Sequence, residues 1–178
     1  HIIVIAAPVA QFASILKTIQ PHLASHTIIT DVGSTKTEVM KSAKEILGPQ
    51  YSQFIGGHPI AGSEKHGATA ADIDLFKNKN VILTPDESTS SQAKKTIEAL
   101  WKNAGAVISN MSHTEHDKIF STISHLPHLL AFSLVDMITQ RPNANELLKF
   151  AASGFKDFTR IAASSPEMWK DITLANKQ

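Results

Sequence analysis

Hydrophobic residues in the N-terminal part of the chain follow two spacings in turn. Ile2 to Ile5 is a continuous β-branched run closed by Pro8, which is typical of a parallel strand covered on both faces. The apolar residues from Val9 to Leu23 then recur at helical spacing. The same alternation continues and predicts strands at 27–32, 54–55, 81–84 and 106–109, and helices at 35–47 and 90–103. Strands that alternate with helices indicate βαβ crossovers and a largely parallel sheet.

Local signals mark the ends of two of these elements. The second predicted helix begins after Ser34 or Thr35, either of which can serve as its N-cap, and Gly48-Pro49 stops it. The third strand is interrupted by the segment Gly56-Gly57-His58-Pro59. We therefore expect His58 to lie on a loop at the end of a strand.

The hydrophobic spacing changes after Met111. From Thr114 to about Ile138, apolar residues repeat at alternating steps of three and four, which predicts one long helix. Pro127 has no N–H to donate within that helix and should kink it. A shorter helix is expected from Asn143 to Ser153, and the rest is helical with a break at Ser165-Pro166. The pattern predicts an α/β sheet unit over residues 1–111 and a mainly helical unit over residues 112–178.

Composition excludes several classes of partner and site. The 178 residues carry a formal net charge of +1, so no strong field favours nucleic acid or an anionic membrane. No apolar run approaches the roughly 20 residues of a membrane helix. The absence of cysteine excludes disulfides, thiolate metal sites and cysteine nucleophiles, and fits a cytoplasmic location. Because the chain opens directly on a strand, we expect that strand to be entered in the middle of a longer protein.

The segment from Ile28 to Lys36 runs from a strand through Gly33 into the start of a helix. Backbone N–H groups and the positive end of the helix favour a carboxylate, a phosphate or a polar cofactor edge there. Ligands of open parallel sheets bind beyond the carboxyl ends of the strands, so Ser34 is placed to offer them a hydroxyl. An N-cap serine beside a turn glycine explains the same residues without any ligand.

The segment from Phe54 to Glu64 contains a histidine between glycines and a proline. Gly56 and Gly57 let the backbone approach another group closely, and Pro59 holds His58 extended. A histidine fixed in this way is a candidate general base because its pKa lies near neutrality. A loop histidine that is hydrogen-bonded for structure alone is the alternative.

Two further groups of polar residues lie in the helical unit. His125 and His128 are three residues apart and lack the helical H-E-x-x-H zinc spacing, so we predict no metal site. Lys156 and Arg160 are four residues apart on one helix face, where two cations repel each other unless they share an anion. A dianionic substrate held bidentately by Arg160 would explain that pair, and a solvated basic face is the simpler explanation.

Together these segments resemble the prephenate/arogenate dehydrogenase family. The matching residues are Ile29–Lys36, Gly56–Glu64, Ser124–His128, Gly154–Ala162 and Met168–Asp171, with smaller agreements at Leu75-Phe76, Thr84-Pro85, Leu100-Trp101 and His116-Asp117. Each motif is weak by itself, but this many in one order along nearly the whole chain are very specific.

The resemblance implies a Rossmann-type dinucleotide-binding domain followed by a helical domain that binds substrate and forms a homodimer. Family members oxidise and decarboxylate prephenate to 4-hydroxyphenylpyruvate, or arogenate to tyrosine, with NAD or NADP as hydride acceptor. The expected partner is thus a small dicarboxylate on the route to tyrosine. No residue in the sequence distinguishes prephenate from arogenate, or NAD from NADP.

The resemblance also implies a role for individual residues. His58 corresponds to the catalytic histidine that accepts a hydrogen bond from the ring hydroxyl of the substrate, Ser34 to the serine that orients this hydroxyl and the nicotinamide, and Arg160 to the arginine that binds the ring carboxylate. The residues that would line or gate the substrate pocket are Glu64, His125, His128, Lys156 and Trp169. Those that would touch the cofactor are Ala7, Pro8, Val9, Gly33 and Ser34.

One departure from the family pattern is clear. No G-x-G-x-x-G follows a first strand, so we expect the first βαβαβ portion of the dinucleotide-binding domain to be missing, and this polypeptide alone to bind NAD(P) very weakly. Two rival hypotheses remain: another Rossmann-type hydroxy-acid dehydrogenase, and a non-catalytic dimerising or tyrosine-sensing module. The first explains neither the Gly-Gly-His-Pro segment nor the Lys156/Arg160 pair.

Overall fold

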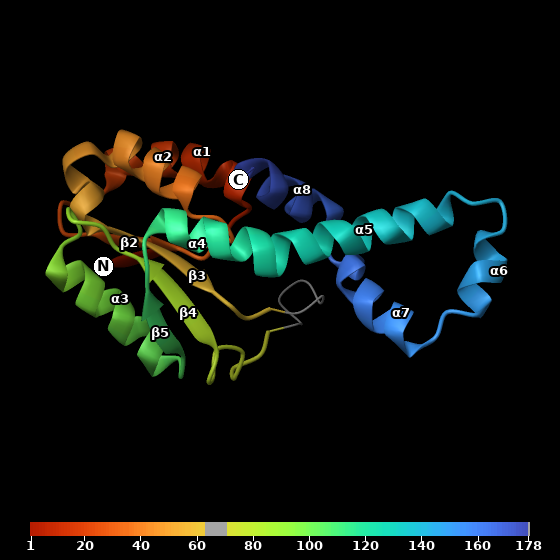
Figure 1. Ribbon diagram of the computed structural model, residues 1–178. Coiled ribbons are helices and arrows are strands. Elements are labelled where there is room, and N and C mark those ends of the chain that lie inside the picture. Colours follow the sequence, from red (N-terminus) through yellow and green to blue (C-terminus); the bar gives the residue numbers. More distant parts are fainter. Residues whose placement is uncertain (63–70, 178) are drawn as a thin grey trace.

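The computed structural model describes residues 1–62 and 71–177. They form a sheet with helices on both faces, from which one long helix extends to a smaller helical region (Figure 1). The strands lie in the order β1-β2-β3-β4-β5, with bounds Ile2–Ile5, Ile28–Asp31, Phe54–Pro59, Asn80–Thr84 and Val107–Asn110. All neighbouring pairs are parallel except β3 and β4. The prediction of a largely parallel α/β sheet is therefore confirmed.

Each face of the sheet has its own core. On one face, α1 (Phe12–Ile19) and α2 (Thr37–Leu47) pack on β1 and β2, while α3 (Ser91–Asn103) covers the other face. Short 3₁₀ turns flank these helices at Val9–Gln11 (η1), Gln20–His22 (η2) and Gly48–Gln53 (η3). Successive side chains of a strand point to opposite faces, so Phe54 enters the first core and Ile55 the second.

Three local expectations were wrong. The third strand does not stop at Ile55 but continues to Pro59, because residues 56–59 pair with β4. Neither Ser34 nor Thr35 caps α2, whose N-cap position is Lys36 and has no side-chain cap. The first strand is not covered on both faces, since Ile2 is 41% exposed.

The expected long helix is present with one irregular turn. It consists of α4 (His113–Phe120), a π-helical turn at Ser121–His125 (η5) and α5 (Leu126–Thr139). Pro127 falls in the first turn of α5, where a backbone N–H is least needed. The irregularity thus precedes the proline, and π-helical turns of this kind are frequent at functional sites.

The chain returns to the sheet through four short helical segments. They are α6 (Ala144–Lys149), α7 (Ser153–Thr159), the 3₁₀ turn η6 (Arg160–Ala163) and α8 (Pro166–Ala175). The last of these lies beside α5 and brings the C-terminus next to α1 (Figure 1). The predicted break at Ser165-Pro166 is confirmed, because α8 begins at Pro166 and the Ser165 hydroxyl caps it by accepting a hydrogen bond from the N–H of Met168. This return places α8 over the ends of the strands.

Candidate active site

Two adjoining hollows lie where β1, β2 and β3 end. The central hollow has a volume of about 640 Å³ and is bordered by β3 and its following residues, the long helix and α8. The second, which we call the strand-end hollow, has a volume of about 450 Å³ and lies between the ends of β1 and β2 and helix α8. Both include Val32, Ser34 and Met168 in their walls. Two ligands could therefore meet at Ser34.

The predicted cofactor-binding residues gather in one place. Ala7, Pro8, Val9, Gly33 and Ser34 all line the strand-end hollow. A Cβ on Gly33 would lie 2.9 Å from both the Asp31 carboxylate and the Val9 side chain, so only glycine leaves this wall open. The wall is uncharged apart from Asp171. A flat ring suits such a wall better than a phosphate, because no cation lines it.

The amides at the start of α2 already have partners. The N–H groups of Lys36 and Thr37 donate to the two oxygens of the Asp117 carboxylate, each at 2.8 Å, and the N–H of Gly33 donates to Asp31 at 2.8 Å. These three N–H groups are therefore bonded within the protein, and the expectation that the turn binds a carboxylate, a phosphate or a polar cofactor edge stays a prediction for its other groups. The anion at the positive end of this helix is the protein's own Asp117.

His58 lines the central hollow and heads a buried chain of side chains. Its Nδ1 lies 2.7 Å from Nε2 of His116, and Nδ1 of His116 lies 2.8 Å from Oδ1 of Asp117. The ring of Phe120 packs against both imidazoles. Because β3 carries His58 and α4 carries the other three residues, the chain joins the sheet to the helical region.

The ionised carboxylate of Asp117 determines which ring nitrogens of His116 and His58 carry protons. Burial acts to raise the pKa of Asp117, but hydrogen bonds from His116, Thr37 and Lys36 outweigh it and lower this pKa to about 2. A carboxylate only accepts, so Nδ1 of His116 carries the proton, and its Nε2 accepts a hydrogen bond from Nδ1 of His58. The Nε2 atom of His58 is then left with a lone pair.

The same surroundings keep His58 in its neutral form. Burial lowers the pKa of His58 well below 6.5; His116, Lys36 and His125 add to this effect, because a positive charge on any of them would repel one on His58, while Asp117 opposes it. Burial also lowers the pKa of His116. A neutral imidazole with a free Nε2 can accept a proton from a hydroxyl group at neutral pH.

Three further predicted residues surround the central hollow at different depths. Trp169 lines it directly, and the ring of His128 stacks on Trp169 with the two centroids 3.6 Å apart. His125 is buried behind Ser34: its ring is hydrogen-bonded to the Ser34 backbone, and its Nδ1 lies 3.2 Å from the amide nitrogen of Asn176. We conclude that His125 holds the Ser34 loop and does not form part of the described wall.

The predicted cations lie farther out. Arg160 and Lys156 are exposed, and neither lines the central or the strand-end hollow. The charge of Arg160 nevertheless reaches His128, whose pKa is lowered first by burial and then by this charge. Glu64 lies outside the described residues. The structure thus brings His58, Ser34 and Trp169 together in one hollow and leaves Arg160 at its periphery.

Sequence reasoning missed Lys36, Asp31, His116 and Asp117 as parts of the site. Their signal was weak because each is a common polar residue, and because several contacts that join them to the site, such as those of Lys36 with Gly57 and Asp117, link residues far apart in the chain. One clue was available: His116 and Phe120 are four residues apart, so the helical pattern places the histidine on the same face as a core aromatic residue.

Comparison with known proteins agrees with this geometry. A family model described as the prephenate dehydrogenase nucleotide-binding domain matches residues 1–110, and one described as the prephenate dehydrogenase dimerization domain matches residues 112–178. The chain belongs to the prephenate dehydrogenase family. The resemblance inferred from the sequence is therefore confirmed.

Individual members of the prephenate dehydrogenase family match along nearly the whole chain. Prephenate dehydrogenase of Bacillus subtilis is 47% identical over 98% of this chain and 47% of its own length. Cyclohexadienyl dehydrogenase of Zymomonas mobilis is 35% identical over 98% of this chain and 60% of its own length. The chain thus spans about half the length of these relatives. The crystal structure of Aquifex aeolicus prephenate dehydrogenase with hydroxyphenyl propionate and NAD+ superposes with a TM-score of 0.91 at 41% identity, covering 99% of this chain and 61% of that one.

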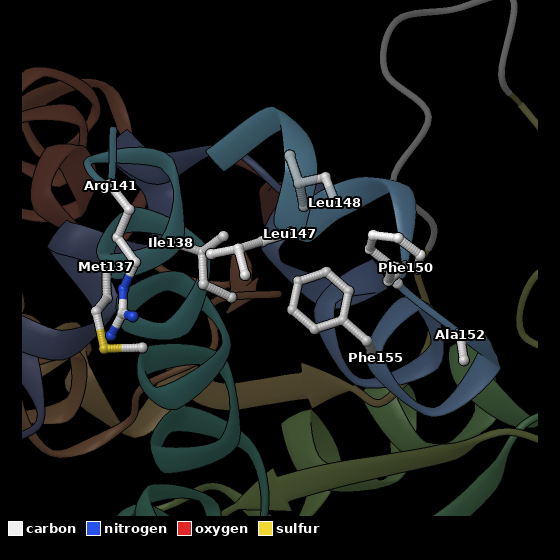
Figure 2. Close-up of a pocket in the computed structure, with 9 residues that line it drawn as sticks. Met137, Ile138, Arg141, Leu147, Leu148, Phe150, Ala152 and Phe155 are labelled. Carbon is white, nitrogen blue, oxygen red and sulfur yellow. The ribbon is translucent and has the colours of Figure 1, made fainter. Parts of the chain in front are cut away.

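A further hollow lies in the helical region, away from the histidines. It has a volume of about 400 Å³ and is lined by apolar side chains of α5, α6 and α7 together with Arg141. Ile138, Leu147 and Phe155 approach one another from these three helices (Figure 2). Its walls carry no acid or base suited to the chemistry described above.

In the described part of the chain, no helix is both long and apolar enough to cross a membrane.

We predict that Asp117 contributes pH-dependent stability. Its pKa is lowered to about 2 from 3.8, so the contribution is present above pH 3.8 and is lost as the pH falls toward 2. The pKa difference corresponds to about 2 kcal/mol. Urea unfolding of the parent and of Asp117→Asn should show a smaller loss of stability between pH 4 and 2 in the variant.

Asp136→Asn is the control, because Asp136 is exposed on α5. Equal acid sensitivity of the parent and Asp117→Asn would mean that Asp117 is not held in its ionised form by the fold.

Proposed function

We propose that the protein carrying this chain catalyses the oxidative decarboxylation of prephenate to 4-hydroxyphenylpyruvate, or of arogenate to tyrosine, with NAD(P)+, in tyrosine biosynthesis. One observation carries the proposal: the hollow lined by all five expected cofactor residues shares Ser34 with the hollow lined by His58. The names of the relatives from Bacillus and Zymomonas support it, as does the Aquifex structure with NAD+.

His58 would act as the acid–base group. Its Nε2 accepts the proton of the ring hydroxyl while the hydrogen on the same carbon leaves as hydride. The bond to the ring carboxylate then breaks and releases carbon dioxide, the freed electron pair makes the ring aromatic, and the phenol oxygen regains a proton. The chain of His116 and Asp117 holds His58 in the tautomer that this step requires.

The walls of the strand-end hollow would hold the nicotinamide end of the cofactor. When bound, NAD(P)+ supplies the hydride acceptor. Gly33 and Val9 allow a flat ring to approach the wall, and Ser34 offers a hydroxyl between the two hollows.

Three further assignments belong to this proposal. The central hollow, at about 640 Å³, falls in the size range of small-molecule sites, roughly 300–1,000 Å³, and suits a six-membered dicarboxylate. The sheet unit would end at residue 111 and the substrate and dimerisation unit would begin at residue 112. The protein would work in the cytoplasm, where the aromatic pathway supplies its substrate.

We predict that His58→Asn lowers kcat/KM by about 10²–10⁴-fold, because asparagine cannot accept a proton at this position. In the unaltered enzyme kcat/KM should stay constant as the pH falls through 6.5 and drop only at lower pH, since burial, then His116, Lys36 and His125, lower the pKa of His58. Steady-state assays across pH with both substrates and both cofactors measure this.

His26→Asn is the control, because His26 is exposed and distant from either hollow. Full turnover in His58→Asn would contradict the catalytic role of His58.

We predict that Arg160→Gln raises KM with a smaller effect on kcat, because Arg160 would pair with a substrate carboxylate. Breaking a desolvated charge pair costs roughly 2–5 kcal/mol. Steady-state assays with Lys149→Gln as an exposed control on α6 test this. A KM equal to that of the parent would show that Arg160 takes no part in substrate binding.

We propose that the protein is a homodimer through its helical region, in agreement with the matched dimerization-domain model and with the apolar side chains exposed there. They include Ile123, Leu126, Leu130, Met137, Leu148, Phe150 and Phe158. Exposed apolar side chains in this number favour self-association.

Sedimentation velocity at micromolar concentration should give a dimer for the parent and a larger monomer fraction for Leu130→Asp, which puts a charge into that surface. Val107→Asp on β5 is the matched control, since Val107 is 51% exposed and Leu130 52%. A monomeric parent protein would refute the assignment.

A further inference from the structure

Lys36 is an unusual residue for the place where it lies. Its side chain is 0% exposed, and its ammonium group is in contact with the carboxylate of Asp31. Removing a cation and an anion from water is costly, and apolar residues of similar volume would often stabilise a protein as well or better. A buried pair of this kind beside a candidate active site therefore calls for an explanation other than stability.

The two charged groups bind the backbone of Gly57, the residue before His58, through its carbonyl and its N–H group. Nζ of Lys36 donates to the Gly57 carbonyl at 2.7 Å, and the N–H of Gly57 donates to Oδ1 of Asp31 at 3.0 Å. The approach is close enough to require glycine, because a Cβ at position 57 would lie 2.7 Å from the Asp31 carbonyl. The ion pair thus fixes the backbone from which the His58 side chain extends.

The backbone of Lys36 also binds Asp117, the carboxylate that orients His116 and through it the imidazole of His58. Its N–H donates to Oδ1 of Asp117, the same oxygen that accepts from His116. One residue therefore contacts both the strand that carries His58 and the carboxylate that orients the hydrogen-bond partner of His58. The strand is β3 and the carboxylate belongs to α4, so Lys36 joins two elements that lie far apart in the chain.

We propose that Lys36, paired with Asp31, is a positioning residue that sets the orientation of the His58 imidazole toward the central hollow. The inference rests on the proposed function, in which His58 is the proton acceptor. Lys36 does not reach the hollow itself, so it acts through Gly57 and Asp117 and not on the substrate.

The charged and titratable groups that face His58 among the described residues come from several elements. They are Lys36 and Asp31 near the ends of α2 and β2, His116 and Asp117 on α4, and His125 in η5. Of these, Lys36, His116 and His125 lower the pKa of His58, after burial, and Asp117 raises it. Removal of the Lys36 charge should therefore raise the pKa of His58.

The test compares Lys36→Met with the double variant Lys36→Met/Asp31→Asn in the natural protein that carries this chain. The double variant leaves no unpaired buried charge and so preserves folding if the single variant does not fold. Lys44→Met is the matched control, since Lys44 is exposed on the same helix. Folding is checked by circular dichroism, and the imidazole of His58 is titrated by NMR.

We expect both variants to lower kcat by about 10²-fold, as a misplaced catalytic group does, with little change in KM. We also expect the acidic limb of kcat/KM and the NMR titration of His58 to move to higher pH. Simple loss of folded protein would lower kcat without moving either pH curve. Unchanged pH curves in a folded variant would overturn the positioning role.

The NMR titration needs no turnover, so it separates this inference from the proposed function. If His58→Asn keeps full activity, the part of the proposed function that makes His58 the proton acceptor fails, whatever Lys36 does. If His58→Asn is inactive and the folded Lys36 variants keep the kcat and pH curves of the parent, the proposed function stands and the inference about Lys36 fails.

Discussion

The structure depends on the buried carboxylate of Asp117 at the start of α2. It accepts hydrogen bonds from the N–H groups of Lys36 and Thr37 and from the ring of His116, so that each oxygen has a strong donor. A helix start normally obtains such a partner from its own N-cap side chain. Here the partner lies far along the chain, 81 residues after Lys36 and 80 residues after Thr37. The bond that completes α2 therefore also fixes α4 on the sheet.

This arrangement links folding with the chemistry of the site. Because Asp117 is ionised whenever the protein is folded near neutral pH, the proton of His116 is fixed on its Nδ1 atom, and the proton of His58 is then fixed on its own Nδ1 atom. The imidazole extends from a residue of β3 that pairs with β4, where it can be held more rigidly than on a loop. Paired glycines make this possible by letting β3 pass close to Asp31 and Lys36.

Patterns within one element were enough to predict much of the fold. The β-branched run at Ile2–Ile5, the helical spacing after Val9 and the turn at Gly48 each depend on neighbouring residues, and the structure confirms them. The strand at 54–55 was predicted too short because Gly56 and Pro59 are poor strand residues in isolation. Pairing with β4 outweighs that local preference, which no local pattern shows.

The candidate site, like the fold, was predictable where its residues stand in local sequence motifs and not where they depend on long-range contacts. Ser34, His58 and Trp169 stand in ordered motifs, and the structure gathers them at one hollow. Lys36, Asp31 and Asp117 owe their importance to burial and to partners that are remote in sequence, and charged residues are ordinarily expected at the surface. His125 belongs to both groups: its motif was visible, but its contact with the Ser34 backbone was not.

Three buried histidines and the half-buried His128 give the site a consistent electrostatic character. The pKa values of His58, His116, His125 and His128 are all lowered, in each case first by burial, and a charge on His116 would further disfavour a charge on His58. The imidazoles therefore remain neutral, and the interior offers lone pairs and N–H groups instead of fixed cations. Lys36 is neutralised by Asp31, while Arg160 and Lys156 stay exposed outside the hollow. A nearby unpaired cation would weaken the basicity on which proton transfer depends, and the pairing of Lys36 with Asp31 limits that effect.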